Sequence, residues 1–213
     1  MKKSFLILFS FLMFACELNS TNEEIVPPNK EIPLTKLESI IKLYNESVFP
    51  LFKNYKNVVV PTDFKVDKDD LSINAGASFG HVEVSQGLIN VTKKHIQLFA
   101  LSHEVAHIVT ISQAKIFGLQ GSIPKGAITN DYKKAEYLAD LIAIHLIKSK
   151  LNKEFSLLST DFPFLQNLLG NSTFTHPSGS DRINDIQTYL ENSISTNNDE
   201  SFKINFLRIW KME

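Results

Sequence analysis

Two histidines and a glutamate interrupt an apolar stretch, "LFALSHEVAHIV", at residues 98–109. His103 and His107 are four residues apart, so on a helix both imidazoles project from one face, one turn apart. At this spacing two imidazoles can bind one zinc ion, and the carboxylate of Glu104 can reach a water molecule that the metal activates. The stretch therefore predicts a zinc site with a glutamate base. The alternative is a helix that carries satisfied polar side chains.

A catalytic zinc ion needs a third protein ligand and an open fourth position. One known pattern places a glycine and a third histidine three and six residues further on. Those positions hold Thr110 and Gln113 here, which excludes that class. The other pattern takes a glutamate from a following helix, and "AEYLAD" supplies Glu136 with Asp140 one turn beyond. We expect Glu136 to bind the metal and Asp140 to accept the free N–H of a ligating histidine, the alternative being two surface acids.

Hydrophobic periodicity predicts the helices that must carry these residues. Residues 92–112 form the expected helix of the histidine pair, and residues 131–150 predict a second helix, apolar on much of its surface and therefore buried. An earlier helix is expected to begin at a capping box of Thr35 and Glu38 and to end or kink at Pro50.

The remaining elements are shorter. Strands are expected at residues 57–61, "NVVVP", and at 81–85, "HVEVS", whose alternation is typical of a half-buried or edge strand. A short helix is expected within 159–171 and an amphipathic helix within 175–192, while the apolar tail at 201–213 leaves helix or strand open. The other histidines are expected at turns or in solvent: His81, His95 and His145.

Composition narrows the class of protein. The chain has 213 residues, which suits one domain with a sizeable core. Its formal net charge is -1 and no basic patch stands out, so a nucleic-acid partner is not expected.

The first residues, "MKKSFLILFSFLMFAC", have the charged start and short apolar run of a secretory signal. Their end resembles the lipobox of bacterial lipoproteins, with Met13 in place of the more usual leucine. We expect residues 1–15 to be a signal peptide, Cys16 to be lipidated and to anchor the chain to a membrane, and residues 16–34 to be a flexible tether. The alternative is a plain signal peptide with an incidental cysteine. Residues 35–213 are the expected folded domain.

Together these motifs resemble the CAAX-prenyl-protease-like zinc metallopeptidases, the HtpX-type family of gluzincins. "HEVAH" followed by "EYLAD" carries the resemblance, and "INAGASFGHVEVSQGLI" and "THPSGSDRI" agree with that family in order and spacing. The resemblance covers about residues 70–190. It implies an α+β, zincin-like metallopeptidase domain, with the active-site helix packed on a small antiparallel sheet and a helical C-terminal part.

The same resemblance implies roles for individual residues. The ligands of one zinc ion would be His103, His107 and Glu136, with Glu104 as general base. His176 would stabilise an oxyanion or cover the metal, Asp140 would support the first histidine, and Arg182 would orient that region. The substrate would pair with an edge strand formed by Asn74, Ala75, Gly80, His81 and Val82.

These expectations combine into a function. The chain is expected to be a zinc metalloendopeptidase that hydrolyses peptide bonds in protein or peptide substrates of the bacterial cell envelope. It would be lipid-anchored, with the outer membrane favoured because Glu17 rather than aspartate follows Cys16. The alternative is a zinc-binding envelope chaperone or adaptor with little or no turnover. A purely structural zinc site would leave Glu104 without a role.

Overall fold

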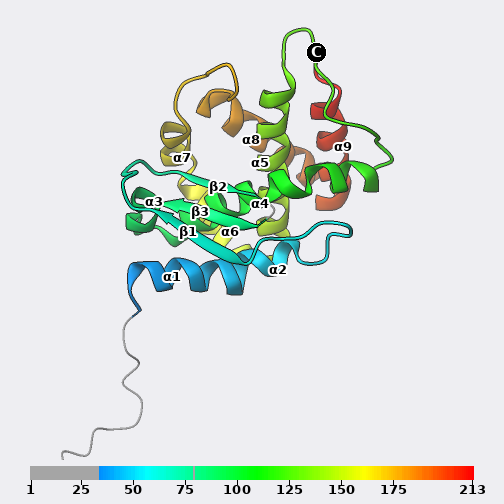
Figure 1. Ribbon diagram of the computed structural model, residues 1–213. Helices are drawn as coiled ribbons and strands as arrows, with labels where there is room; N and C mark the ends of the chain where they lie inside the picture. Colours follow the sequence, from blue (N-terminus) through cyan, green and yellow to red (C-terminus); the bar gives the residue numbers. More distant parts are fainter. Residues whose placement is uncertain (1–33, 79) are drawn as a thin grey trace, which may run out of the picture. The chain divides into compact units, whose positions relative to one another are not determined.

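A computed structural model of the chain describes residues 34–78 and 80–213 (Figure 1). Within this part, Leu34–Glu213 forms one compact unit. The expected signal peptide, the lipidation site Cys16 and the tether up to residue 33 lie outside the described residues. The described chain is mostly helical and contains a three-stranded sheet, which is the mixture of helices and strands that the sequence predicts.

The elements run along the chain in a fixed order, with one π-helical segment labelled η1. They are α1 (Lys36–Leu43), η1 (Tyr44–Val48), α2 (Phe49–Phe52), β1 (Asp63–Asp67), β2 (Ala75–Ala77), β3 (His81–Ser85), α3 (Gln86–Asn90), α4 (Lys94–Ile116), α5 (Asp131–Lys150), α6 (Asn152–Thr160), α7 (Phe162–Leu169), α8 (Gly179–Ser195) and α9 (Asn198–Trp210). Among the described residues, no helix is long and apolar enough to cross a bilayer.

The first helix begins at the predicted capping box. The backbone N–H of Glu38 donates to the Thr35 hydroxyl at 3.2 Å, and the Thr35 N–H donates to the Glu38 carboxylate at 2.8 Å. Pro50 does not end the helical run, because the π-helical segment η1 comes just before it and α2 continues to Phe52. The wider turn accommodates the missing N–H of the proline without breaking the run.

Residues 57–61 are not a strand, and that prediction is wrong. A side-chain hydrogen bond holds this segment instead: the Tyr44 hydroxyl donates to the Pro61 carbonyl at 2.5 Å. Val60 and Pro61 are buried without ladder partners, and β1 begins only at Asp63. Proline cannot donate to a sheet, so the β-branched run ends before it can pair.

The sheet has the strand order β1-β3-β2. β1 and β3 are parallel, whereas β2 and β3 are antiparallel, so the sheet is mixed and the expected all-antiparallel sheet is wrong. The expectation of β3 as an edge strand is also wrong, since it lies in the centre and β2 forms one edge. The segment at residues 68–74 carries the chain past the end of β3, and this leaves room for β3 to insert between the other two strands.

Gly87 explains how this connection passes so close to the sheet. A Cβ atom at Gly87 would lie 2.0 Å from the Ser72 carbonyl oxygen and 2.4 Å from that of Leu71. Only glycine lets the 68–74 segment cross the start of α3 at this distance. Ile73 and Asn74 are the last residues of the segment. Because the segment crosses so closely, they lie beside α4 and line a cavity with it.

The core lies where the sheet and α5 meet α4. α4 packs against β2 on one side and against α5 on another, and α5 packs in turn against α9 (Figure 1). Much of α5 is buried, as its apolar surface predicts. The tail that the sequence left open is the helix α9, whose Phe206 and Ile209 are fully buried.

Two histidines expected in solvent are not there: His145 is buried and His95 is half-buried. The His145 ring, 8% exposed, stacks on Phe202 with ring centroids 4.0 Å apart, and its Nδ1 lies 3.1 Å from the Tyr189 hydroxyl. His95 lies near the start of α4, and its Nε2 is 2.5 Å from the Asp161 carboxylate. Tertiary packing of α8 and α9 on α5 determines the burial of His145, which local sequence does not reveal.

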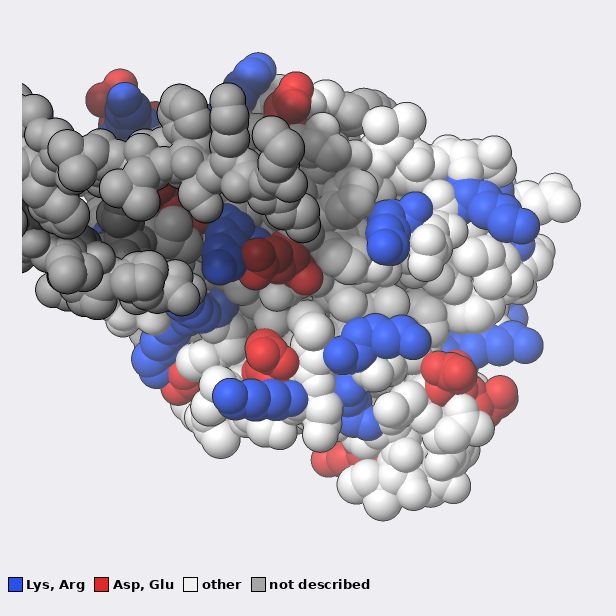
Figure 2. All heavy atoms as spheres, turned by 90° about the horizontal axis from the view of Figure 1, so that it is seen from below, with Lys and Arg blue, Asp and Glu red and all other residues white. Residues whose placement is uncertain are grey.

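Charges of both signs are interspersed on the surface. Figure 2 looks at the molecule from below in the orientation of Figure 1, and its Lys and Arg side chains lie among Asp and Glu side chains. On α1, the Lys42 ammonium lies 3.9 Å from a carboxylate oxygen of Glu46 one turn further on.

Candidate metal centre

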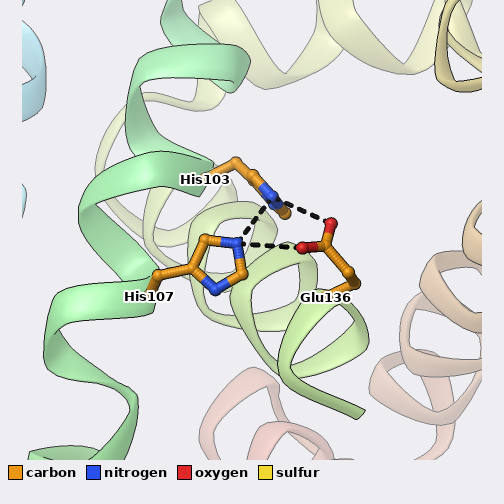
Figure 3. Close-up of side chains that lie close together, drawn as sticks. All are labelled: His103, His107 and Glu136. Carbon is orange, nitrogen blue, oxygen red and sulfur yellow. Dashed lines mark hydrogen bonds and ion pairs between the residues drawn. The ribbon is translucent and has the colours of Figure 1, made fainter. Parts of the chain in front are cut away.

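Two helices bring three potential metal ligands together (Figure 3). α4 supplies His103 and His107 one turn apart, and α5 supplies Glu136. The two Nε2 atoms are 3.0 Å apart, and each lies 3.3 Å from an oxygen of the Glu136 carboxylate. One donor atom from each residue lies within 4.8 Å of the others, so the group could hold a metal ion, as the sequence predicts.

The group is buried on one side and open on the other. His103 is 6% exposed and Glu136 is 8% exposed, whereas the His107 side chain is 29% exposed. Solvent therefore reaches the three donors from the side of His107. A metal ion held here would keep access to small molecules from that side.

Asp140 and Arg182 lie behind the donors, as predicted. A carboxylate oxygen of Asp140 is 2.8 Å from Nδ1 of His103. Arg182 donates from Nε and Nη2 to the two Asp140 oxygens, at 2.6 Å each, and its Nη1 lies 3.1 Å from Glu136. A proton on Nδ1 would leave the Nε2 lone pair directed at the other two donors, which is the orientation that a metal-binding histidine needs.

The pKa values of these groups follow from burial and from the charged neighbours. Burial alone would lower the pKa of His103, but the charge and hydrogen bond of Asp140 raise it to about 9. Burial would raise the pKa of Glu136, yet the hydrogen bonds from both histidines hold it well below its ordinary value. Glu136 is therefore ionised, which is the form that binds a metal.

Carboxylates outnumber the guanidinium groups at the site. Three carboxylates, those of Glu104, Glu136 and Asp140, line or support the cavity beside one guanidinium, that of Arg182. Because the pKa of His103 is raised to about 9, its imidazolium adds a second positive charge when no metal is bound. A divalent cation that displaces this proton would pair with the carboxylates in its place, since buried charges persist only when they are paired or bind metal.

The donors open into a cavity of about 320 Å³. It is lined by polar groups at one end and by apolar side chains at the other: Ile73, Asn74, Ala75, Ile96, Phe99, Ala100, His103, Glu104, His107, Glu136, Leu165, Leu168, Leu169, His176 and Arg182. The structure thus brings most of the predicted site residues to one cavity.

Glu104 lines this cavity next to the ligands. Among the described residues, no side chain forms a hydrogen bond or ion pair with its carboxylate. Burial raises the pKa of Glu104 above its ordinary value, against the lowering effect of His103 and His107. A carboxylate with a raised pKa and no partner among the described residues is suited to accept and release a proton.

His176 stands at the rim of the cavity. Its side chain is 53% exposed, and its Nε2 lies 3.6 Å from an oxygen of Glu136. Its Nδ1 is 2.8 Å from the Thr175 hydroxyl, which helps to set the direction of the ring. His176 therefore faces the metal position from the loop that precedes α8.

Only some of the residues of the predicted substrate edge lie at an edge of the sheet. Asn74 and Ala75 line the cavity, and Ala75 begins the edge strand β2. By contrast, His81 and Val82 belong to the central strand β3, whose backbone is paired on both sides, and Gly80 precedes that strand. The alternation of "HVEVS" indicates one buried face, but a central strand between two short partners has the same alternation as an edge.

Sequence reasoning missed the apolar end of the cavity. Leu165, Leu168 and Leu169 of α7 line it, together with Ile73 from the segment before β2. The leucines recur at i, i+3 and i+4, which is the signal of an apolar helix face that could have revealed them. The spacing does not show which element this helix face packs against, because that depends on tertiary packing.

No family model, no curated protein and no solved structure matches the chain.

Proposed function

We propose that the protein is a zinc-dependent metalloendopeptidase with a zincin-like domain, similar to the HtpX-type gluzincins. The observation that carries the proposal is that donor atoms of His103, His107 and Glu136 lie close together, beside the carboxylate of Glu104 in the same cavity. Two imidazoles and a carboxylate are the ligand set of catalytic zinc sites that leave a fourth position open.

The distances support zinc as the metal. Two ligands that each lie about 2.0–2.1 Å from a tetrahedral zinc ion are about 3.4 Å apart. The Nε2 atoms of His103 and His107 are 3.0 Å apart, and each lies 3.3 Å from a different oxygen of Glu136. A small shift of the imidazoles therefore suffices to accept the ion. A hard cation such as magnesium or calcium favours oxygen ligands instead.

The cavity supports hydrolysis of a peptide bond. A bound zinc ion would lower the pKa of a water molecule toward about 7 and polarise the scissile carbonyl. Glu104 accepts a proton from the attacking water and passes it to the leaving amine, so one water is consumed and a carboxylate and an amine are released. His176 is in position to donate a hydrogen bond to the developing oxyanion.

Substrate binding would use the edge of the sheet. One side of β2 has no strand partner among the described residues, and Asn74 and Ala75 at its start line the cavity. An extended peptide that adds to this edge would receive main-chain hydrogen bonds and lie along the cavity. This arrangement favours unfolded or extended protein segments as substrates.

The test uses the zinc-loaded full chain and its Glu104→Gln variant. We expect the parent to cleave unfolded casein or a reporter peptide, a chelator to stop the cleavage, and the variant to retain zinc while it loses activity. Cleavage by the variant at the rate of the parent contradicts the proposed role of Glu104. Suppression of aggregation by both proteins, without cleavage by either, favours the chaperone or adaptor.

We propose further that the protein is lipid-anchored in the bacterial cell envelope, with the domain outside the cytoplasm. The support is the sequence of residues 1–16 alone, since they lie outside the described residues. Mass spectrometry of the purified full chain tests it: a diacylated or triacylated Cys16 at the new N-terminus supports anchoring, and an unmodified cysteine contradicts it.

A further inference from the structure

α4 presents two parallel rows of side chains to the cavity. Each row is spaced by four residues: Phe99, His103 and His107 form one, and Ile96, Ala100 and Glu104 form the other. The N-terminal part of both rows is apolar and the C-terminal part carries the donors and the base. The Phe99 and His103 rings, with centroids 6.1 Å apart, mark the boundary between the two parts.

The distance along α4 between the apolar part and the donors indicates which residue of a bound peptide would reach the apolar part. One helical turn advances about 5.4 Å along α4. One residue of an extended peptide spans about 3.3 Å. A side chain that reaches the apolar part therefore belongs to a residue that adjoins the scissile bond, rather than to one far along the substrate.

α7 forms the opposite apolar wall. Leu165 is buried at its base, while Leu168 and Leu169 are partly exposed to the cavity. Among these larger apolar groups, Ala100 is a small side chain on the α4 wall, partly exposed and one turn before Glu104. The small methyl group of Ala100 leaves depth in the cavity next to the catalytic end.

The α7 wall is fixed at both ends. Asp161, just before α7, accepts from Lys93 at 2.7 Å and lies 2.5 Å from Nε2 of His95, so it ties α7 to the start of α4. At the other end, the Gly179 N–H donates to the Gly170 carbonyl at 2.8 Å, and a Cβ atom on Gly179 would lie 2.0 Å from the Gln166 carbonyl oxygen, so α8 begins directly against α7. The two apolar walls are thus held in place before substrate binds.

We propose that these walls form a subsite for a large apolar side chain next to the scissile bond, and that Ala100 sets the depth of this subsite. The inference deepens the proposed peptidase function and rests on it. A preformed apolar pocket discriminates by the size of the side chain, and each methylene that fits or is excluded changes the specificity constant by about 10-fold or more. The substrate class is therefore an extended segment with leucine, isoleucine, methionine or phenylalanine beside the bond that is cut.

The test compares the zinc-loaded full chain with Ala100→Phe on peptides that carry Leu or Ala at each position flanking the cut. We expect the parent to favour the Leu peptide and Ala100→Phe to lose at least about 10-fold of that preference. Zinc content should be the same in both. Leu168→Ala should shift the preference toward Phe and Trp, because it enlarges the subsite from the other wall. Ala127→Phe is the matched control, since this exposed alanine does not line the cavity.

A second readout separates this inference from the proposed function. Peptide binding to the zinc-loaded Glu104→Gln protein is measured by fluorescence anisotropy, with and without Ala100→Phe. Tighter binding of the Leu peptide that disappears with Ala100→Phe supports the subsite, even if the parent cleaves nothing and the peptidase assignment fails. Equal binding of Leu and Ala peptides, or a Leu preference that survives Ala100→Phe, overturns the subsite.

Discussion

The guanidinium of Arg182 donates to both carboxylate oxygens of Asp140, at 2.6 Å each, and a third nitrogen lies 3.1 Å from Glu136. One buried cation thus contacts the group that orients His103 and a proposed metal ligand. Because a planar guanidinium can bind a carboxylate in this forked way, it holds both groups in a fixed relation.

Removing this guanidinium should weaken metal binding. We expect Arg182→Gln to lower the affinity for zinc by about 10–100-fold, because Asp140 and Glu136 lose their shared partner. Competition with a zinc-binding dye measures the change. Arg208→Gln is the control, since Arg208 forms its ion pair with Asp185 instead. Equal affinities for the parent and Arg182→Gln would show that Arg182 plays no part in the site.

Removing the metal should destabilise the fold. The three potential ligands come from α4 and α5, so a bound ion would link the two helices. At a free zinc concentration 100 times the dissociation constant, binding adds about 2.7 kcal/mol to the free energy of unfolding. For a domain of this size we expect a rise in melting temperature of roughly 5–11 °C. Calorimetry with zinc and with a chelator measures it, and His107→Ala should remove the difference.

His145 should make the fold sensitive to mild acid. Burial lowers the pKa of His145 to about 4, whereas an unfolded histidine titrates near 6.5. Between these values the unfolded state binds more protons, so the free energy of unfolding falls as the pH is lowered from 6.5 to 4. The expected loss from this group is at most about 3 kcal/mol.

Urea denaturation at pH 6.5 and pH 4.5 measures this loss in the parent and in His145→Gln. The variant keeps a polar side chain beside Tyr189 but cannot bind the extra proton. We expect its free energy of unfolding to fall less over this interval. An identical fall in both proteins would show that His145 does not cause the acid sensitivity.

Gly87 should be required for the crossing of the 68–74 segment. Gly87→Ala would place a Cβ atom 2.0 Å from a backbone oxygen of Ser72, which must then move. We expect a loss of about 1–3 kcal/mol in the free energy of unfolding, measured in urea. Gly76→Ala, where nothing lies within 4 Å of the added atom, should stay within about 0.5 kcal/mol of the parent.

The sequence predicted the metal-donor group because its determinants are local. His103 and His107 share a helix face through their spacing, and Glu136 stands out as a carboxylate in an apolar helix. The helices α4 and α5 were predicted for the same reason, since their periodicity extends over many turns. The contact of Glu136 with the histidine pair needed only that the two helices pack.

The arrangement of the strands was not predictable in this way. β3 lies in the centre because the segment at 68–74 passes over Gly87, and alternation in "HVEVS" does not distinguish a central strand from an edge. The apolar end of the cavity depends on how α7 is anchored by Asp161, a contact between residues far apart in the chain. Such long-range packing has no periodic signal in the sequence.

X-ray absorption spectroscopy at the zinc edge, on the zinc-loaded full chain, tests most directly whether His103, His107 and Glu136 hold one catalytic ion. We predict one zinc per chain, bound by two imidazole nitrogens and by oxygen ligands at about 2.0–2.2 Å, and loss of the ion in His103→Ala. A chain that stays free of metal after loading, or a zinc ion whose ligands do not change in His103→Ala, would contradict this assignment.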